Sequence, residues 1–120
     1  MRSLAIIAAL WAGPAVAVEL TVPSGHVLTL FDVIIDPPMG RFRFTLPAIS
    51  EGVGFDQLVD DFDYLCRQVA QPALAQSDVV VTDIVISVSA SEVPFGNATD
   101  VVQYFQPYRL VDGVCVWDAF

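Results

Sequence analysis

One segment of the chain, residues 55–70, has the periodicity of an amphipathic helix, and it limits the folds open to the rest. At about 100° per residue its apolar side chains fall within an arc of about 120°. They are Phe55, Leu58, Val59, Phe62, Leu65, Cys66 and Val69. A separate polar stripe carries Asp56, Asp60, Asp63 and Arg67. Pro72 predicts the end of the helix soon after residue 70. A helix with one apolar face must pack on another apolar layer.

The other periodic segments alternate with the period of two that is typical of β-strands. Residues 26–35 and 41–46 alternate in this way, and the turn residues of 36–40 separate them. They are predicted to form a hairpin with Asp36 opposite Arg41. One face would carry Phe31, Val33, Ile35, Phe42, Phe44 and Leu46, and the other Asp32, Asp36, Arg41 and Arg43.

The second half of the chain predicts three more strands. Residues 79–88 are the first, with Val80, Ile84, Ile86 and Val88 on one face and Asp83, Ser87 and Ser89 on the other. Residues 94–97 are predicted as a loop, and residues 98–105 as a segment with a short helical turn. The dipeptide Asp112-Gly113 is preferred in two-residue hairpins, so it predicts pairing of residues 108–111 with 114–117. That register places Leu110 opposite Cys115 and Tyr108 opposite Trp117.

Together these elements predict one α+β domain. A single amphipathic helix packs on a mainly antiparallel sheet, in the order β-β-α-β-β-β. Residues 18–25, which contain Pro23 and Gly25, are expected to be an irregular lead into the first strand.

The first 17 residues have the pattern of a secretory signal peptide. Met1-Arg2-Ser3 is a short positive start, residues 4–11 are apolar, and Ala15-Val16-Ala17 supplies the small residues that a signal peptidase reads. Cleavage after Ala17 leaves residues 18–120 as the domain, in the periplasm or secreted. Contact with the membrane would then be transient, through the signal peptide alone. A retained membrane anchor and a buried N-terminal helix are the alternatives, but the uncharged stretch is shorter than the roughly 20 residues that span a bilayer.

The two cysteines, Cys66 and Cys115, both lie in the predicted domain. An exported chain with two cysteines most simply forms one disulfide. Cys66 lies on the apolar arc of the helix, and Cys115 shares a hairpin face with Tyr108, Leu110 and Trp117. Because helix-on-sheet packing brings such faces together, the sequence predicts a Cys66–Cys115 bond.

Charge and composition exclude several classes of function. Five Arg and no Lys stand against 14 Asp and Glu, for a net charge of -9. Nucleic-acid binding needs clustered Lys and Arg, so it is excluded as a function. The absence of lysine also excludes Schiff-base chemistry and a P-loop. Two Cys and one His leave no ligand set for a Cys/His zinc site, and we expect no metal and no cofactor.

Residues with catalytic potential are few. Asp56, Asp60, Asp61 and Asp63 could form a calcium or acid–base cluster, but their helical spacing favours a solvated helix face. His26 has no nucleophile placed beside it by a motif, so no catalytic residue is assigned. Aromatic side chains gather towards the C-terminus around Arg109, and the candidate binding residues there are Tyr108, Arg109 and Trp117.

Several short motifs resemble a family of small exported proteins of alphaproteobacteria whose function is unknown. The motifs are Val22-Pro23-Ser24-Gly25, Arg41-Phe42-Arg43-Phe44, Phe62-Asp63-Tyr64-Leu65-Cys66, Ile84-Val85-Ile86-Ser87, Pro94-Phe95-Gly96, Tyr104-Phe105, Tyr108-Arg109-Leu110 and Cys115-Val116-Trp117. The resemblance implies a domain of unknown function and assigns no catalytic or binding residue. Some relatives are labelled acetolactate synthase, an enzyme that needs a much longer chain to hold thiamine diphosphate, magnesium and two substrates.

Two functions stay open on the sequence. The preferred one is a small periplasmic binding or accessory module that acts through contact with an unknown protein partner, for which the acidity favours a cationic surface. The alternative is a small hydrolase-like enzyme that uses Asp carboxylates. Two carboxylates converging in a pocket would favour the enzyme, and a flat surface or an open strand edge would favour the binder.

Overall fold

The structure, a computed structural model, describes residues 17–118. The predicted signal peptide therefore lies outside the described residues, apart from Ala17. A six-stranded sheet runs in the order β1-β2-β3-β4-β5-β6. The strands are β1 (Val18–Thr21), β2 (Val27–Asp36), β3 (Met39–Thr45), β4 (Asp83–Ser89), β5 (Gln103–Val111) and β6 (Val114–Trp117).

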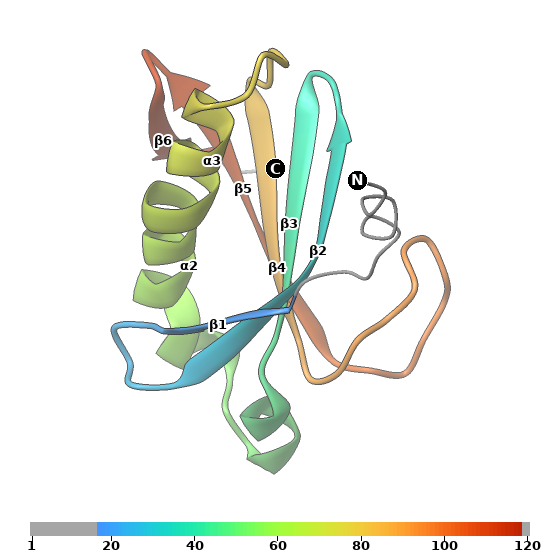
Figure 1. Cartoon of the computed structure of the whole chain (residues 1–120). Helices are drawn as coiled ribbons and strands as arrows, with labels where there is room; N and C mark the ends of the chain where they lie inside the picture. The colour runs from blue at the N-terminus through green and yellow to red at the C-terminus, as the bar shows by residue number, and fades with distance from the viewer. Residues whose placement is uncertain (1–16, 119–120) are drawn as a thin grey trace, which may run out of the picture.

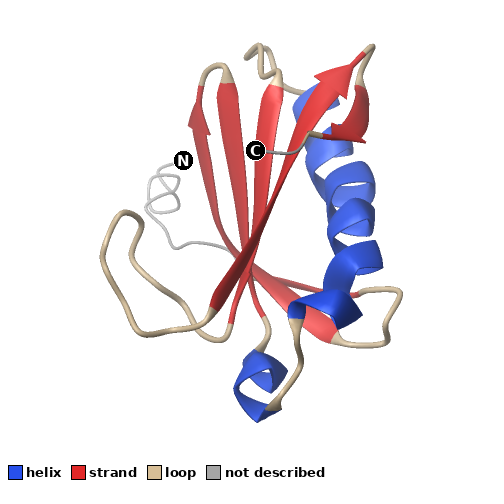
Figure 2. Ribbon diagram, turned by 180° about the vertical axis from the view of Figure 1, so that it is seen from behind, coloured by secondary structure: helices blue, strands red, loops and turns tan. Residues whose placement is uncertain are grey.

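A helical segment crosses one face of this sheet, and the β4–β5 loop (residues 90–102) lies on the opposite side of the molecule (Figures 1 and 2). β3 and β4 pair in parallel, whereas the other neighbouring strands pair antiparallel. A parallel pair needs a long crossover, and the helical segment is part of that connection. The α+β class is confirmed, but the predicted element order is not, because β1 precedes the expected strands.

The helical segment runs from Phe55 to Ala75 in four parts. A 3₁₀ turn (Phe55–Leu58) leads into α2 (Val59–Leu65), then a π-helical turn (Cys66–Ala70) and α3 (Gln71–Ala75). The expectation that Pro72 ends the helix is wrong. Proline lacks an N–H and crowds the preceding turn, and here that turn is widened, with the Gln71 N–H donating to the Cys66 carbonyl five residues earlier.

The β2–β3 hairpin exists, but its predicted register is wrong. Asp36 lies opposite Met39 rather than Arg41, because Pro37-Pro38 alone form the turn. A further irregularity between Leu30 and Asp32 takes Phe31 out of the alternation. Phe31 therefore leaves the apolar face to which it was assigned, and Leu30 faces Phe44 there instead.

Three other boundaries differ from the predictions. Val18–Thr21 forms β1 along the first half of β2 instead of an irregular lead. β4 begins at Asp83, and Val80, expected on its apolar face, is 74% exposed. β5 begins at Gln103, where a helical turn was expected. The final hairpin is as predicted, with Leu110 opposite Cys115 and Tyr108 opposite Trp117.

The core fills the space between the helical segment and the sheet. Its fully or nearly fully buried side chains include Leu28, Phe42, Phe44, Leu58, Phe62, Leu65, Ile84, Ile86, Val88 and Tyr108. Val59, expected on the apolar face of the helix, is 43% exposed. The prediction of a solvated acidic face also fails at one position, since Asp61 is 1% exposed. The Ser24 N–H and hydroxyl donate to its two carboxylate oxygens at 2.9 Å and 2.6 Å.

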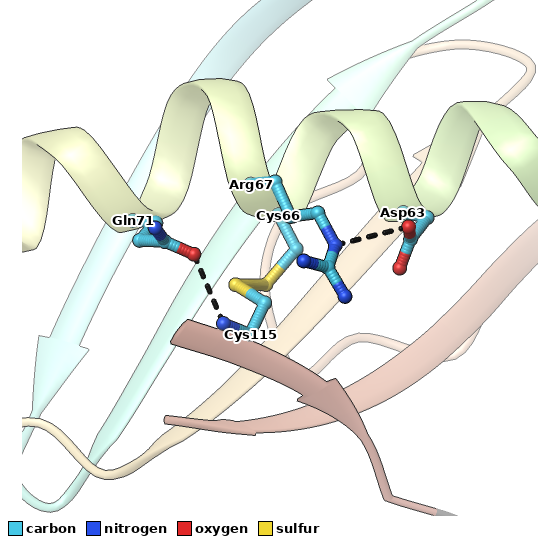
Figure 3. The surroundings of a disulfide bond; sticks show 5 residues. All are labelled: Asp63, Cys66, Arg67, Gln71 and Cys115. Atoms are coloured by element: carbon cyan, nitrogen blue, oxygen red, sulfur yellow. Dashed lines mark hydrogen bonds and ion pairs between the residues drawn. A yellow bond between two sulfur atoms is a disulfide. The ribbon is translucent and has the colours of Figure 1, made fainter. Parts of the chain in front are cut away.

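The predicted Cys66–Cys115 disulfide is present and joins the π-helical turn to β6 (Figure 3). The two Cα atoms are 6.2 Å apart, and both side chains are fully buried. A second link lies beside the bond, where the Cys115 N–H donates to Gln71 Oε1 at 2.9 Å. Within residues 17–118, no helix is long and apolar enough to cross a membrane.

Candidate functional site

The sheet face turned away from the helix carries the polar side chains of β3 and β4. Strand alternation places Arg41 and Arg43 of β3 on this face, with Ser87 and Ser89 of β4 beside them. The register sets Arg43, Ser87 and Phe105 in one row across β3, β4 and β5. The β4–β5 loop folds against this row.

A pocket of about 170 Å³ lies between this face and the β4–β5 loop. Its polar lining comes from Arg41, Arg43, Ser87, Asn97 and Gln103. Its apolar lining comes from Val85, Val93, Pro94, Phe95 and Phe105. A loop of this length without helix or strand is typical of a binding or active-site segment. We call this hollow the loop pocket.

Arg43 fastens the β4–β5 loop to the sheet. Its Nη1 donates to Asp32 Oδ2 at 2.7 Å, and its Nη2 donates to the Val93 carbonyl at 2.6 Å. The guanidinium carbon lies 5.0 Å from the ring centre of Phe31 and 5.5 Å from that of Phe95. Because the Arg43 side chain is only 8% exposed and is paired on both sides, its role is to hold the wall of the pocket.

Arg41 differs from the other arginines of the described range. Arg43, Arg67 and Arg109 each form an ion pair with an Asp. Among residues 17–118 no carboxylate lies within 4.0 Å of the Arg41 guanidinium, although all 14 acidic residues fall in that range. Its guanidinium carbon lies 5.1 Å from the ring centre of Phe95, which is 55% exposed. The positive charge of Arg41 is therefore available to a ligand.

Ser87 supplies a buried hydroxyl in the lining of the loop pocket. The residue is 3% exposed, and its hydroxyl finds no hydrogen-bond partner among the protein atoms of the described chain. Ser89, two residues along the same face, is satisfied because its hydroxyl donates to Gln103 Oε1 at 3.3 Å. Buried polar groups are nearly always paired, so the Ser87 hydroxyl stands out.

The structure does not bring the three candidate binding residues into one site. Tyr108 is buried on the helix-facing side, and Trp117 lies opposite it with its indole N–H donating to Gln106 Oε1 at 3.2 Å. Arg109 lies on the other face. Its Nη2 is 3.3 Å from Asp118 Oδ2, and its Nε is 3.7 Å from Asp83 Oδ1. Burial raises the pKa of the Tyr108 hydroxyl well above its usual value of 10.0, and the nearby Asp63 carboxylate raises it further. Arg67 acts in the opposite direction on that pKa.

The acidic residues of the helix do not form one cluster, because Asp61 and Asp63 each pair with a different residue. Asp61 binds Ser24, and Asp63 accepts from Arg67 at 3.1 Å. Within residues 17–118, no three His, Cys, Asp or Glu side chains are placed to hold a metal ion.

The sequence reasoning did not select Arg41, Ser87 or Phe95. Alternation did place Arg41 and Ser87 on the polar faces of their strands, and Phe95 fell within the predicted loop of residues 94–97. The signal that could have selected them is a loop of unusual length beside two polar strand faces.

Comparison with known proteins places the chain in a family. No curated protein and no solved structure matches it. The model of the family of unknown function DUF6497 matches residues 5–120, in agreement with the expected resemblance to a family of unknown function. Because the match spans nearly the whole sequence, the chain belongs to the family of unknown function DUF6497.

Proposed function

We propose that this protein is an exported binding module that holds its ligand in the loop pocket. The observation that carries the proposal is Arg41, whose guanidinium forms no ion pair within residues 17–118 in a protein of net charge -9. It borders a hollow with aromatic walls, and a few polar groups in a largely apolar hollow are the usual composition of a ligand site.

The lining of the loop pocket favours binding over the hydrolase alternative. An enzyme that uses Asp carboxylates needs two of them to converge on a substrate. None of the Asp and Glu side chains of residues 17–118 lines the loop pocket. Asp32 and Glu92 line a neighbouring hollow beyond Phe95, where Asp32 is already paired with Arg43.

The site changes the kind of partner to be expected. The acidity of the chain favours a cationic partner for its surface as a whole. The loop pocket, by contrast, offers positive charge and hydrogen-bond donors. We assign ligand recognition to this pocket. A protein partner that uses the site would insert one small group into it.

The disulfide supports the export part of the proposal. Disulfides persist in the periplasm and outside the cell, whereas cytosolic thiols are kept reduced. The Cys66–Cys115 bond is fully buried between helix and sheet, as a structural bond would be.

The test is to locate binding on the isotope-labelled exported protein by NMR. The probes are four aromatic compounds of one shape and different charge: benzoate, benzamide, benzylamine and phenyl phosphate. We expect at least one of them to change the chemical shifts of backbone amides mainly in β3–β5, beside the sheet face turned away from the helix, and in residues 93–97. Shifts confined to other surfaces, or no shifts with any probe, would contradict the proposed function.

A further inference from the structure

We propose that the ligand group recognised in the loop pocket is a carboxylate on a short apolar body, paired with Arg41 and hydrogen-bonded by the Ser87 hydroxyl. This inference rests on the proposed function, because it names the chemistry of the ligand for the same pocket.

The polar lining of the loop pocket consists mainly of hydrogen-bond donors. Arg41 has only donors, and the Ser87 hydroxyl has no hydrogen-bond partner in the part of the protein that the structure describes. Gln103 accepts through Oε1 from Ser89, which leaves its NH₂ group as the free end of that amide. Because the described residues that line it include no Asp or Glu, the pocket is complementary to an acceptor that carries negative charge.

The positive charge of the pocket matches a ligand group with one negative charge better than a group with two. Two arginines line the pocket, and Arg43 is neutralised by Asp32 at 2.7 Å, whereas Arg41 has no carboxylate partner among residues 17–118. A phosphate dianion would exceed that single charge inside a protein that is already strongly acidic. A carboxylate matches it, and its two oxygens fit the planar fork of a guanidinium.

The walls and the size of the pocket define the rest of the ligand. Val85, Phe95 and Phe105 offer apolar surface, so a fully polar anion would leave them unused. The volume of about 170 Å³ corresponds to roughly six water molecules. Such a space admits a short-chain or single-ring acid, or the last residue of a peptide with its terminal carboxylate.

The buried Ser87 hydroxyl is the second, independent observation for this ligand. A buried hydroxyl without a partner destabilises a fold, and an alanine would fill the same position in β4 without that cost. A ligand oxygen in the pocket would satisfy it. The Ser87 hydroxyl would therefore form a hydrogen bond in the bound state that it does not form with the described residues alone.

The experiment measures dissociation constants of the exported protein by calorimetry, with benzoate as the probe and benzamide and phenyl phosphate as its matched analogues. We expect benzoate to bind at least tenfold more tightly than either analogue. Arg41→Gln should weaken benzoate binding tenfold or more, whereas Arg67→Gln removes an equal charge on the helix and should leave it unchanged. Equal affinities for benzoate and benzamide in the loop pocket would overturn the carboxylate assignment and leave the proposed function standing.

Ser87→Ala separates a binding role from a structural one. We expect this variant to melt at or above the temperature of the parent protein and to bind benzoate about tenfold more weakly. Ser89→Ala is the control for stability, because it removes a hydroxyl on the same face that is satisfied by Gln103 and should therefore melt below the parent protein. Unchanged benzoate affinity in Ser87→Ala would overturn the role assigned to the hydroxyl.

Two further probes distinguish a free acid from the end of a protein chain. The tripeptide acetyl-Ala-Ala-Phe is compared as the free acid and as its C-terminal amide. Binding of the acid more tightly than benzoate, with loss in the amide, supports a chain terminus as the source. Binding of benzoate alone supports a free small acid. Binding of acid and amide equally well would contradict carboxylate recognition.

Discussion

Asp32 and Arg43 lie directly opposite each other in the β2–β3 hairpin, and Arg43 Nη1 donates to Asp32 Oδ2 at 2.7 Å. The same guanidinium donates to the Val93 carbonyl in the β4–β5 loop. This pair therefore links the position of a strand to the position of the pocket wall, and its loss should affect both stability and loop order.

Asp32→Asn should destabilise the protein by about 2 kcal/mol, because it leaves the buried Arg43 charge without its counterion while Asp32 itself remains partly solvated. Asp63→Asn, which breaks the exposed pair with Arg67, should cost no more than about 0.5 kcal/mol. Urea unfolding at pH 7 measures both. Equal, small losses would show that the Arg43 charge is well hydrated in the folded protein.

Asp61→Asn should cost about 2 kcal/mol. The change replaces one of the two carboxylate oxygens that accept from Ser24 with an NH₂ group, so a buried donor faces another donor. The neighbouring exposed residue provides the control, and Asp60→Asn should change the free energy of unfolding by less than about 0.5 kcal/mol. Hydrogen exchange at the Ser24 amide should accelerate in Asp61→Asn only.

Reduction of the disulfide should lower the melting temperature strongly, since closing a loop across a sequence separation of 49 residues is worth about 4 kcal/mol. Cys66→Ser should have a similar effect. Non-reducing peptide mapping should recover a fragment that joins Cys66 to Cys115. Two free thiols in the unfolded, unreduced protein, or a linked dimer in the absence of reductant, would contradict the intramolecular bond.

Stability should fall as the pH rises above about 10, because of Tyr108. Below the usual tyrosine pKa of 10.0 the hydroxyl is protonated in both states, so its contribution is fully present. Above it the unfolded tyrosine loses its proton while Tyr108 in the fold keeps it, which lowers the free energy of unfolding by up to about 1.4 kcal/mol per pH unit. Urea midpoints between pH 9 and pH 11 should show this fall, and Tyr108→Phe should flatten it. An equally steep fall in Tyr108→Phe would assign the effect to other groups.

The export prediction concerns the first residue of the mature chain. Because Ala15-Val16-Ala17 has the small residues of a cleavage site, N-terminal sequencing of the periplasmic protein should begin at Val18. Intact chains that begin at Met1, recovered in washed inner membranes, would support the retained anchor instead.

Local patterns predicted the parts of this fold that are set by neighbouring residues. Asp112-Gly113 determines the last hairpin because a two-residue turn leaves one register, and that register is confirmed. β1 was missed because its side chains are mostly exposed, so they leave no apolar alternation to detect. The irregularity after Leu30 was missed because one extra residue shifts a strand's faces without changing its composition.

The loop pocket could not be predicted from the sequence for a different reason. The polar faces of β3 and β4 were recognised separately, but only their parallel pairing places Arg43 beside Ser87. That pairing depends on a crossover of more than thirty residues between Thr45 and Asp83. The contact of Arg43 with the Val93 carbonyl joins residues 50 positions apart in the sequence, and no local pattern predicts it.

The Cys66–Cys115 bond closes a covalent ring that contains β4, the whole β4–β5 loop and β5. A protease that cuts this loop, which is largely exposed, cannot release either piece, because the disulfide still joins them. A cut chain would keep the mass of the intact protein plus one water until reductant separates it into two bands. The protein can therefore survive cleavage beside its own pocket as a single two-chain molecule.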